Sequence, residues 1–315
     1  MRQVALRRLL FLPLQLLAVA SVCFFLLRAA PGNPFEGERK LPEAVLKNLE
    51  ERYHLSGPWY EQWWAFVGGT LTFDFGVSLK YRDRPVRSII AEAAPVSFAL
   101  GSLAFVFGLG LAVVAGVAGA ALSADVRLKF VDRLVMTKAS LLIAAPKFLL
   151  GGLLVYLFSF RLRWLPPAQW GDISQVILPV LTLALPVAGS LTLLIRNSML
   201  EVLQSRYVQT GRAKGLGQLR LVALHALPNA MHGVLSYLGP VFATLLTGSF
   251  VVEKIFAVPG MGWQFVASVM DRDYTTVLGA SVFFAAVLVL ANLVADLAAA
   301  WIDPRSGEIP GEDVA

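Results

Sequence analysis

Side chains that could carry out chemistry are few in this sequence, and they are poorly spaced for it. His54, His225 and His232 are too far apart or too isolated to share a metal ion, so each is interpreted as structural. The P-loop pattern Gly-x-x-x-x-Gly-Lys-Ser/Thr is absent from the sequence, so we expect no ATP site in this chain. The sequence has a single cysteine, Cys23, which lies in an apolar run, so an intrachain disulfide is excluded. We therefore predict no catalytic residue, no metal ion and no cofactor bound by this chain.

Ionisable residues inside the apolar runs are rarer still. Lys147, next to Pro146, falls near the middle of one run, where a lysine costs about 3 kcal/mol on insertion scales. It should face the bundle interior or a water-filled path. Two interpretations stay open: the lysine packs against a carbonyl or partner group in a tilted or shifted helix, or it has a role in a substrate path. Asp296 is the one acidic candidate, and we place it at the membrane interface. Carriers driven by protons or sodium usually need buried acids, so the chain is predicted to lack its own energy source.

A polar, basic insert separates two apolar runs in the second half of the chain. Leu200, Leu203, Tyr207 and Gly211 fall on one face of a predicted helix, whereas the basic residues point elsewhere. The segment 215–217, Gly-Leu-Gly, ends that helix and allows a sharp reversal.

Residues 218–227 are predicted to form a second short helix, and Pro228 to mark the start of the next span. A helix lying on the lipid surface would carry similar charge, but it would not need the glycine break. The pattern therefore favours a rigid element that a soluble cytosolic subunit contacts.

The composition is that of a membrane protein and is too apolar for an ordinary soluble domain. Of 315 residues, 57% are hydrophobic and 15% are charged, and the mean hydropathy is +0.67, whereas a soluble domain has about 25% charged residues. The net charge of +6 is interpreted as basic cytoplasmic loops and not as nucleic-acid binding. We predict an all-α membrane protein with six transmembrane helices, at residues 9–27, 93–124, 134–160, 173–195, 229–252 and 275–295.

Several details of these spans are predicted. The first run is long for a signal peptide and residues 28–31 make a poor cleavage site, so we expect a retained span. In the second span the small residues of 108–112 and 115–119 favour close helix packing. In the fourth span Pro179 and Pro186 are expected to break the helix.

The distribution of Lys and Arg in the short loops places both termini in the cytoplasm. This gives an N-terminal end with the first span (1–30), an extracytoplasmic segment (31–94), a transmembrane core (95–302) containing the inner insert (196–228), and a polar tail (303–315). Within the extracytoplasmic segment we expect an amphipathic helix over 41–53. The aromatic residues of 59–66 are expected at the membrane interface, where anchoring is favoured over contact with an external partner.

The insert resembles the "EAA" loop of permease subunits from bacterial ATP-binding-cassette (ABC) importers. That pattern is Glu-Ala-Ala, three residues, Gly, and a Leu-Pro pair that ends thirteen residues after the glycine. Gly215 and Leu227-Pro228 match it, whereas Gln209-Thr210-Gly211 replaces Glu-Ala-Ala. The peptide-importer branch usually has Arg-Thr-Ala-Arg-Ala-Lys-Gly-Leu, and the residues that agree with it are Thr210, Arg212, Ala213, Lys214, Gly215 and Leu216.

The resemblance extends over essentially the whole chain. Segments similar to the first permease subunit, the B subunit, of oligopeptide importers include Asp74-Phe75-Gly76, Thr247-Gly248-Ser249, Pro259-Gly260-Met261-Gly262, Arg272-Asp273-Tyr274 and Ile302-Asp303-Pro304-Arg305. The fold that this implies is that of a type I ABC importer permease in the bacterial inner membrane. The substrate is implied to be oligopeptides, with dipeptides, glutathione or nickel chelates as alternatives.

The resemblance also implies partners. A second, homologous permease would complete the translocation path, and an extracytoplasmic peptide-binding protein would dock outside. Two cytoplasmic ATPases, which themselves hold ATP and Mg, would receive the insert in a groove, and their closure would reopen the path outward. A rival class is a secondary transporter or channel that works without an ATPase, and another is a scaffold or receptor that moves no solute.

The resemblance assigns the coupling role to named residues. Gly215 would supply the turn, Arg212 and Lys214 would contact the ATPase, and Leu216 would fill an apolar pocket. The full coupling set is Tyr207, Thr210, Gly211, Arg212, Ala213, Lys214, Gly215, Leu216, Leu227 and Pro228. Lys147 is the candidate for the substrate path, where it would meet a peptide carboxylate.

Overall fold

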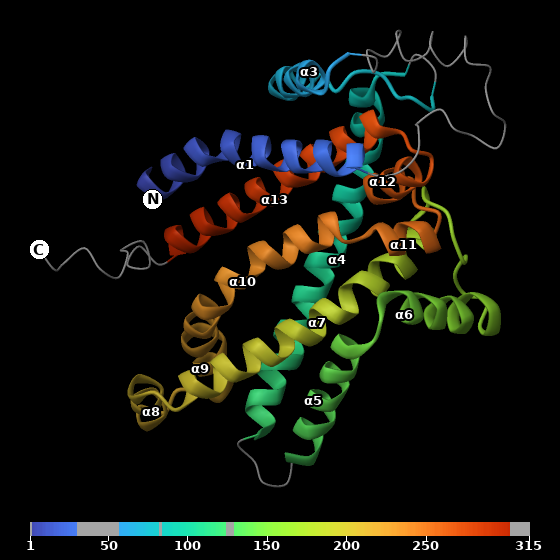
Figure 1. Cartoon of the computed structure of the whole chain (residues 1–315). Helices are drawn as coiled ribbons and strands as arrows, with labels where there is room; N and C mark the ends of the chain where they lie inside the picture. The colour runs from blue at the N-terminus through green and yellow to red at the C-terminus, as the bar shows by residue number, and fades with distance from the viewer. Residues whose placement is uncertain (1, 30–56, 82–83, 124–128, 303–315) are drawn as a thin grey trace, which may run out of the picture.

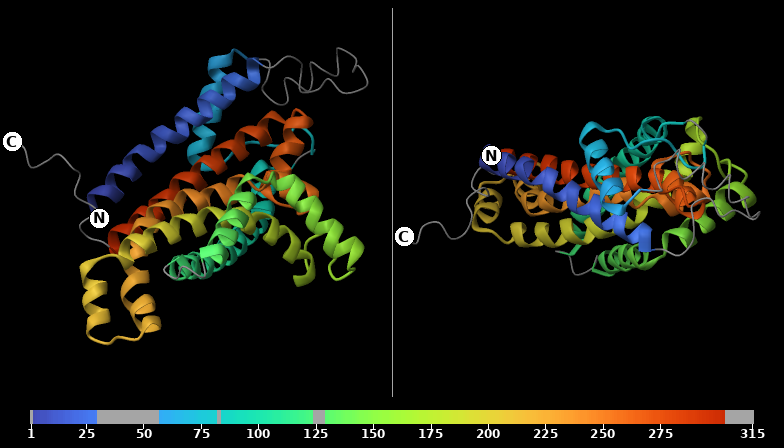
Figure 2. Two further views of the ribbon diagram at one scale, coloured as in Figure 1. Left: turned by 90° about the horizontal axis from the view of Figure 1, so that it is seen from below. Right: turned by 45° about the horizontal axis from the view of Figure 1, so that its top comes forward.

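The computed structural model describes residues 2–29, 57–81, 84–123 and 129–302. In this part of the chain helices are joined by turns and loops, and one isolated bridge pairs Val77 with Pro85. Figures 1 and 2 show the arrangement of the helices. They are α1 (Arg2–Ala29), α3 (Trp59–Thr72), α4 (Val86–Ser123), α5 (Lys129–Ala144), α6 (Lys147–Leu154), α7 (Ile173–Leu203), α8 (Arg206–Ala213), α9 (Gln218–Leu221), α10 (Leu227–Thr247), α11 (Phe250–Ile255), α12 (Met261–Met270) and α13 (Tyr274–Ile302), with π-helical segments η1 (Val155–Arg161) and η2 (Val222–Ala226). The helix expected over 41–53 and the tail 303–315 lie outside the described residues.

Five helices are long and apolar enough to cross a membrane, and a bent pair brings the number to six when it is counted as one span. The bent pair is α5 followed by α6 and η1, with an angle of 109° between its halves. The start of α1 and the end of α13 lie toward the same end of the bundle as α8, whereas α3, α6 and α12 lie toward the other (Figures 1 and 2). The prediction of an all-α protein with six spans is confirmed in this form.

The third span is not the continuous helix predicted over 134–160. α5 ends where the amide of Ala145 donates to Leu141 O at 3.0 Å, and α6 begins where the amide of Leu150 donates to Pro146 O at 3.0 Å. Proline has no amide hydrogen and disfavours helical backbone in the residue before it, so the helix stops and changes direction there. Lys147 is therefore the first residue of α6 and not the middle of a straight span.

Other boundaries differ from the prediction. α7 runs unbroken through Pro179 and Pro186, so the expectation that these prolines break the fourth span is wrong. Each proline removes only one backbone hydrogen bond, which a long helix packed on several sides tolerates. The fifth span is interrupted at Gly248 and Ser249, between α10 and α11. α4 begins at Val86, so the extracytoplasmic segment predicted over 31–94 includes the first turns of this helix.

Glycine on α4 lets this helix approach α7 closely. The buried small residues Gly108, Ala112, Gly116 and Ala120 are four apart and form one stripe, whereas Ala115 is half-buried beside it. A Cβ on Gly108 would lie 2.9 Å from the carbonyl oxygen of Ala184, and a Cβ on Gly116 would lie 2.9 Å from Cβ of Ile195. The helices thus meet nearly backbone to backbone, as small-xxx-small stripes permit.

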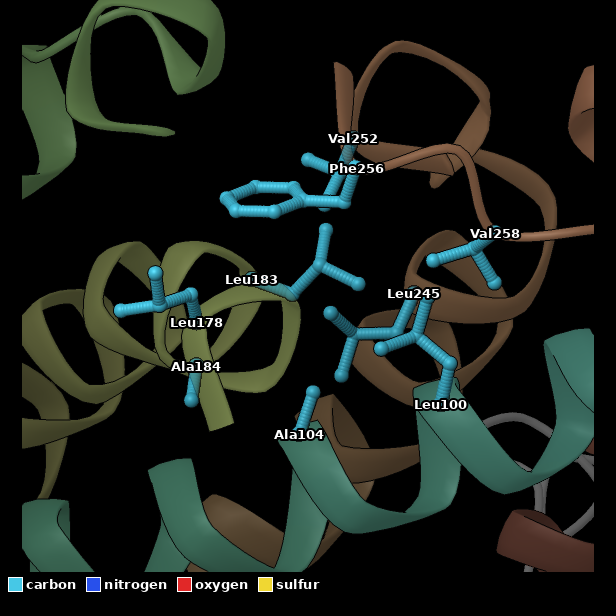
Figure 3. Close-up of a cluster of buried hydrophobic side chains, with 9 residues drawn as sticks. All are labelled: Leu100, Ala104, Leu178, Leu183, Ala184, Leu245, Val252, Phe256 and Val258. Atoms are coloured by element: carbon cyan, nitrogen blue, oxygen red, sulfur yellow. The ribbon is translucent and has the colours of Figure 1, made fainter. Parts of the chain in front are cut away.

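Apolar clusters extend this contact at both ends of the bundle. Figure 3 shows the outer cluster, in which side chains of α4, α7, α10 and α11 converge, with Phe256 above Leu183. Its members are Leu100, Ala104, Leu178, Leu183, Ala184, Leu245, Val252, Phe256 and Val258. The inner cluster joins α4, α7 and α10 and includes Leu191, Ile195, Met199, Ala230 and Val234. α7 contributes to both clusters, so its two ends are held in one packed unit.

α1 and α3 form an outer layer on this core. α1 lies along α13 (Figure 1), and α3 contacts α1 through Trp63, whose Nε1 donates to Ser21 Oγ at 3.1 Å. Trp59, Tyr60 and Trp64 of α3 are 49%, 50% and 65% exposed. This exposure fits the predicted interfacial position of the aromatic cluster, because Trp and Tyr are enriched at that depth.

The glycine stripe of α4 generates a stability prediction with a matched control. Gly116→Ala places a methyl group against Ile195, and overpacking of this kind costs about 1–3 kcal/mol. Gly110 lies on the exposed face of the same helix, and a Cβ added there would point into open space, so Gly110→Ala should leave stability unchanged or raise it. Thermal unfolding of the detergent-solubilised protein measures both variants. Equal melting temperatures would contradict the proposed α4–α7 contact.

Candidate functional site

A polar hairpin projects from the inner ends of α7 and α10 and contains most of the predicted coupling residues. We call residues 204–226 the inner hairpin; it comprises α8, a turn, α9 and η2. Figure 2 shows it extending beyond the neighbouring helices (gold). Its position at the end of two long helices lets a contact on the hairpin act directly on both.

The hairpin begins with a corner that the sequence did not predict. The expected continuous helix over 200–211 is broken at Gln204 and Ser205, where Ser205 adopts extended backbone. The side-chain amide of Gln209 donates to the carbonyl oxygen of Gln204 at 3.1 Å, which satisfies a group freed at the end of α7. Gln209, at the first position of the "EAA" pattern, thereby stabilises the angle between α7 and α8.

The turn after α8 is a Schellman motif centred on Gly215. The amide of Leu216 donates to Gly211 O at 3.2 Å and the amide of Gly215 donates to Arg212 O at 3.0 Å. Gly215 has φ of +76°, a left-handed conformation that favours glycine. The sharp reversal predicted at this glycine is confirmed, and its geometry supplies the physical reason for the residue.

The buried face of α8 differs from the predicted one. Val208 is fully buried and Gly211 is buried, and a Cβ on Gly211 would lie 2.7 Å from Leu221 of α9. Tyr207, which was expected on the same helix face as Gly211, is 46% exposed. The reason is the corner at Ser205, which rotates α8 relative to the periodicity of α7.

The remaining predicted residues lie on the surface of the inner hairpin. Thr210, Arg212, Ala213, Lys214 and Gly215 are exposed, and Leu216 is half-buried. Exposed leucines, Leu219 at 83% and Leu224 at 61%, accompany the basic side chains. The sequence has no Asp or Glu between 202 and 252, so the hairpin presents positive charge and apolar surface without compensating acids. Such a surface is complementary to an acidic groove with apolar pockets.

Leu227 and Pro228 begin α10 directly after η2, and the two features are linked. Pro228 has no amide hydrogen and its ring would clash with a carbonyl one turn earlier in a regular helix. The wider π-helical turn over Val222–Ala226 accommodates it, so helix continues from α9 into α10. The expected start of a new span at Pro228 is thus a change of helix type within one continuous helical segment.

Lys147 lies at the bend between α5 and α6, away from the inner hairpin. Its side chain is half-buried, and within the part of the chain that the structure describes no hydrogen bond or ion pair joins it. Gly151, one turn further along α6, packs against Thr182 of α7 and Phe256. The side chain of Asp296, the other ionisable candidate, is outside the described residues.

Two buried carboxylates at the outer end hold separate helices together through hydrogen bonds, a role that the sequence analysis did not predict. Glu253 is fully buried and accepts hydrogen bonds from Ser97 Oγ at 2.8 Å, Ser249 Oγ at 2.6 Å and the amide of Trp263 at 2.9 Å. These contacts hold α11 and the start of α12 against α4. The position of Glu253 directly after an apolar run gave no sign of these partners, because Ser97 is 156 residues away.

Asp273 performs a similar task at the start of α13. It accepts hydrogen bonds from Ser78 Oγ, from the amide of Leu79 at 3.0 Å and from Thr276 Oγ1 at 2.7 Å. An acidic residue just before an apolar run is a helix-start signal, which could have identified its capping role. Among the described residues no group of His, Cys, Asp or Glu could hold a metal ion.

Comparison with known proteins agrees with this architecture. The family model for the binding-protein-dependent transport system inner membrane component matches residues 108–308. The chain is 39% identical to the oligopeptide transport system permease protein OppB of Haemophilus influenzae over 92% of its length and 94% of the relative. It is 40% identical to the dipeptide transport system permease protein DppB of Bacillus subtilis, over 92% and 93% of the two chains.

A solved structure of the MetNI methionine ABC transporter in an inward-facing conformation has a similar fold. The TM-score is 0.56 at 16% identity, and the match covers 70% of this chain and 98% of the other. The helical bundle is thus that of a type I ABC importer permease. From the family match and these relatives, the chain belongs to the binding-protein-dependent transport system inner membrane components, multi-pass proteins of the bacterial inner membrane.

Proposed function

We propose that this chain is the transmembrane subunit of an ATP-driven importer of oligopeptides. With a second, homologous permease it forms the translocation path, and two cytoplasmic ATPases that hold ATP and Mg supply the energy. An extracytoplasmic peptide-binding protein delivers the substrate. The observation that carries the proposal is the inner hairpin, a rigid basic element at the inner ends of α7 and α10, in a chain of this family.

The inner hairpin is suited to dock into the ATPase. The Schellman turn fixes the orientation of Arg212 and Lys214, which contact polar groups of the ATPase. Leu216 packs in part on Gly211, and Leu219 and Leu224 extend the apolar contact surface. Closure of two ATPases moves the two hairpins together. Because the hairpin continues into α7 and α10, this movement reaches the translocation path.

Peptides are the proposed substrate class, because the relatives named for oligopeptide and dipeptide transport are about equally similar to this chain. Peptide length is then selected by the binding protein. The described buried carboxylates of Asp132, Glu253 and Asp273 each join separate segments of the chain, through hydrogen bonds from Arg196, Ser97 and Leu79. We therefore assign them to packing and not to a secondary transporter that carries protons or sodium.

The turn of the inner hairpin provides the test of this proposal. Gly215→Asp places a side chain at φ of +76°, which costs about 1–2 kcal/mol and distorts the turn. We expect the protein to insert and assemble normally while ATP-dependent peptide uptake is abolished. Uptake of labelled peptides into proteoliposomes with ATP inside measures this outcome.

Gly217 is the matched control for that substitution. It lies in the same turn and is also exposed with open space around it, but its φ is an ordinary −59°. Gly217→Asp therefore introduces the same charge without the backbone strain, and it should retain most uptake. Normal uptake by Gly215→Asp would refute the coupling role of the turn.

Lys147 generates a separate prediction about the substrate path. If its ammonium group meets the carboxylate of a peptide, Lys147→Met removes a charge-assisted hydrogen bond, and a bond of that kind contributes about 1.5–3 kcal/mol. Uptake of peptides with a free C-terminus should fall at least about tenfold, whereas uptake of C-terminally amidated peptides should not change. Lys138→Met, at an exposed position on α5, is the control. An equal loss for both kinds of peptide would exclude this role.

A further inference from the structure

An ion pair joins the inner ends of α5 and α7, outside the inner hairpin itself. Arg196 Nε donates to Asp132 Oδ1 at 2.8 Å, and Arg196 Nη2 donates to Asp132 Oδ2 at 2.6 Å. Two parallel hydrogen bonds hold the carboxylate and the guanidinium in one plane. Asp132 is 5% exposed, so its carboxylate depends on Arg196 and not on water.

α4 closes over this ion pair. A Cβ on Gly119 would lie 3.2 Å from Asp132 Oδ1 and 3.4 Å from Arg196 Cδ, so a larger residue would crowd both partners. Buried ion pairs give little net stability compared with apolar residues of the same volume. This pair does fix the geometry between two helices. The planar guanidinium of Arg196 can make both hydrogen bonds with only one orientation of the Asp132 carboxylate.

A second contact repeats this constraint two turns further out. A Cβ on Gly189 of α7 would lie 2.6 Å from the carbonyl oxygen of Ala139 of α5. Ala139 follows Asp132 by seven residues and Gly189 precedes Arg196 by seven, as expected for antiparallel helices in one register. Two fixed points on each helix prevent α5 from sliding along α7 or rotating against it.

The two helices lead to different parts of the molecule. Seven residues after Arg196, α7 ends at Leu203, and the corner to α8 follows. In the opposite direction, α5 ends at Ala144, where the chain bends by 109° into α6. The ion pair therefore lies between the inner hairpin and the arm formed by α6 and η1, which begins at Lys147.

From this arrangement we infer that Asp132 and Arg196 are positioning residues that make α5 follow the inner end of α7. Movement of the inner hairpin is then transmitted through α7 and also through α5, to the bend at Pro146 and to the arm that follows it. The inference rests on the proposed function, because it requires that the hairpin moves with the ATPases. Neither residue contacts substrate or nucleotide in this account, and their effect is on the coupling between hydrolysis and transport.

The test compares peptide uptake with ATP hydrolysis in the complete complex, isolated with its partner subunits through a tag on this chain. Asp132→Asn removes the negative charge and keeps the shape of the side chain. Arg196→Lys keeps the positive charge and removes the planar guanidinium that donates two parallel hydrogen bonds. Only complexes of wild-type size are reconstituted, and labelled tri-alanine is the transported probe. The quantity measured is the amount of peptide taken up per ATP hydrolysed.

We expect ATP hydrolysis to continue in both variants while uptake per ATP falls about 2- to 30-fold, the range for mutations in a coupling network. The double variant Asp132→Arg with Arg196→Asp should recover much of the wild-type ratio, because the pair re-forms with its charges exchanged. Arg133→Gln, which changes an exposed charge next to Asp132, should leave the ratio unchanged.

Three outcomes would overturn the inference. The first is a wild-type ratio in both Asp132→Asn and Arg196→Lys. The second is failure of both variants to assemble, which would assign the pair to folding alone. The third is an equal fall in Arg133→Gln, which would show a general effect of charge. Failure of the proposed function is distinguishable from these, because wild-type complexes would then take up no peptide with ATP.

Discussion

Close backbone contact along α7 is the constraint on which the rest of the structure depends. α4 approaches it through Gly108 and Gly116, α5 approaches it at Gly189, and α6 approaches it through Gly151. In lipid, helices gain little from burying apolar side chains against one another, so dispersion contacts at short distance provide much of the association energy. A helix enclosed in this way on several sides moves only together with its neighbours. Since α7 leads directly into the inner hairpin, the hairpin is attached to the most constrained element of the bundle.

The ends of the bundle are stabilised differently from its middle. At the outer end, Glu253 and Asp273 accept hydrogen bonds from hydroxyl groups and from backbone amides at the starts of α12 and α13. A buried carboxylate with several such donors needs no cation, because helix N-termini favour negative charge. At the inner end, corners and turns are satisfied by backbone and amide groups, as with Gln209 and Gly215. Irregular backbone thus occurs where polar partners are available, as the hydrocarbon phase requires.

Local sequence was sufficient for features that depend on local chemistry. The helical class and the positions of the apolar runs follow from composition and periodicity, and the turn at Gly215 follows from the need for a left-handed residue. The bend at Pro146 was available from the same rules, yet the uncharged run around it favoured a single straight helix. The corner at Ser205 has no glycine or proline to mark it, and the apolar spacing of Leu200, Leu203 and Tyr207 suits one helix.

Contacts distant in sequence could not be predicted in this way. Asp132 and Arg196 are separated by 64 residues, and Ser97 and Glu253 by 156. Each of these residues taken alone is compatible with an exposed position in a loop or at a helix end. Only the register of the packed helices brings the partners together, and that register depends on which glycines face which helix.

We propose that the inner hairpin is the surface through which ATPases act on this chain. The most direct measurement is site-specific photo-crosslinking in membranes, with the photoreactive residue at position 219, where the leucine is 83% exposed. The same residue at the exposed position 173, at the opposite end of α7, is the reference. We predict a covalent adduct from position 219 to a protein that contains a P-loop, and none from position 173. Adducts from position 219 that contain only lipid would mean that the inner hairpin lies on the membrane and not against an ATPase.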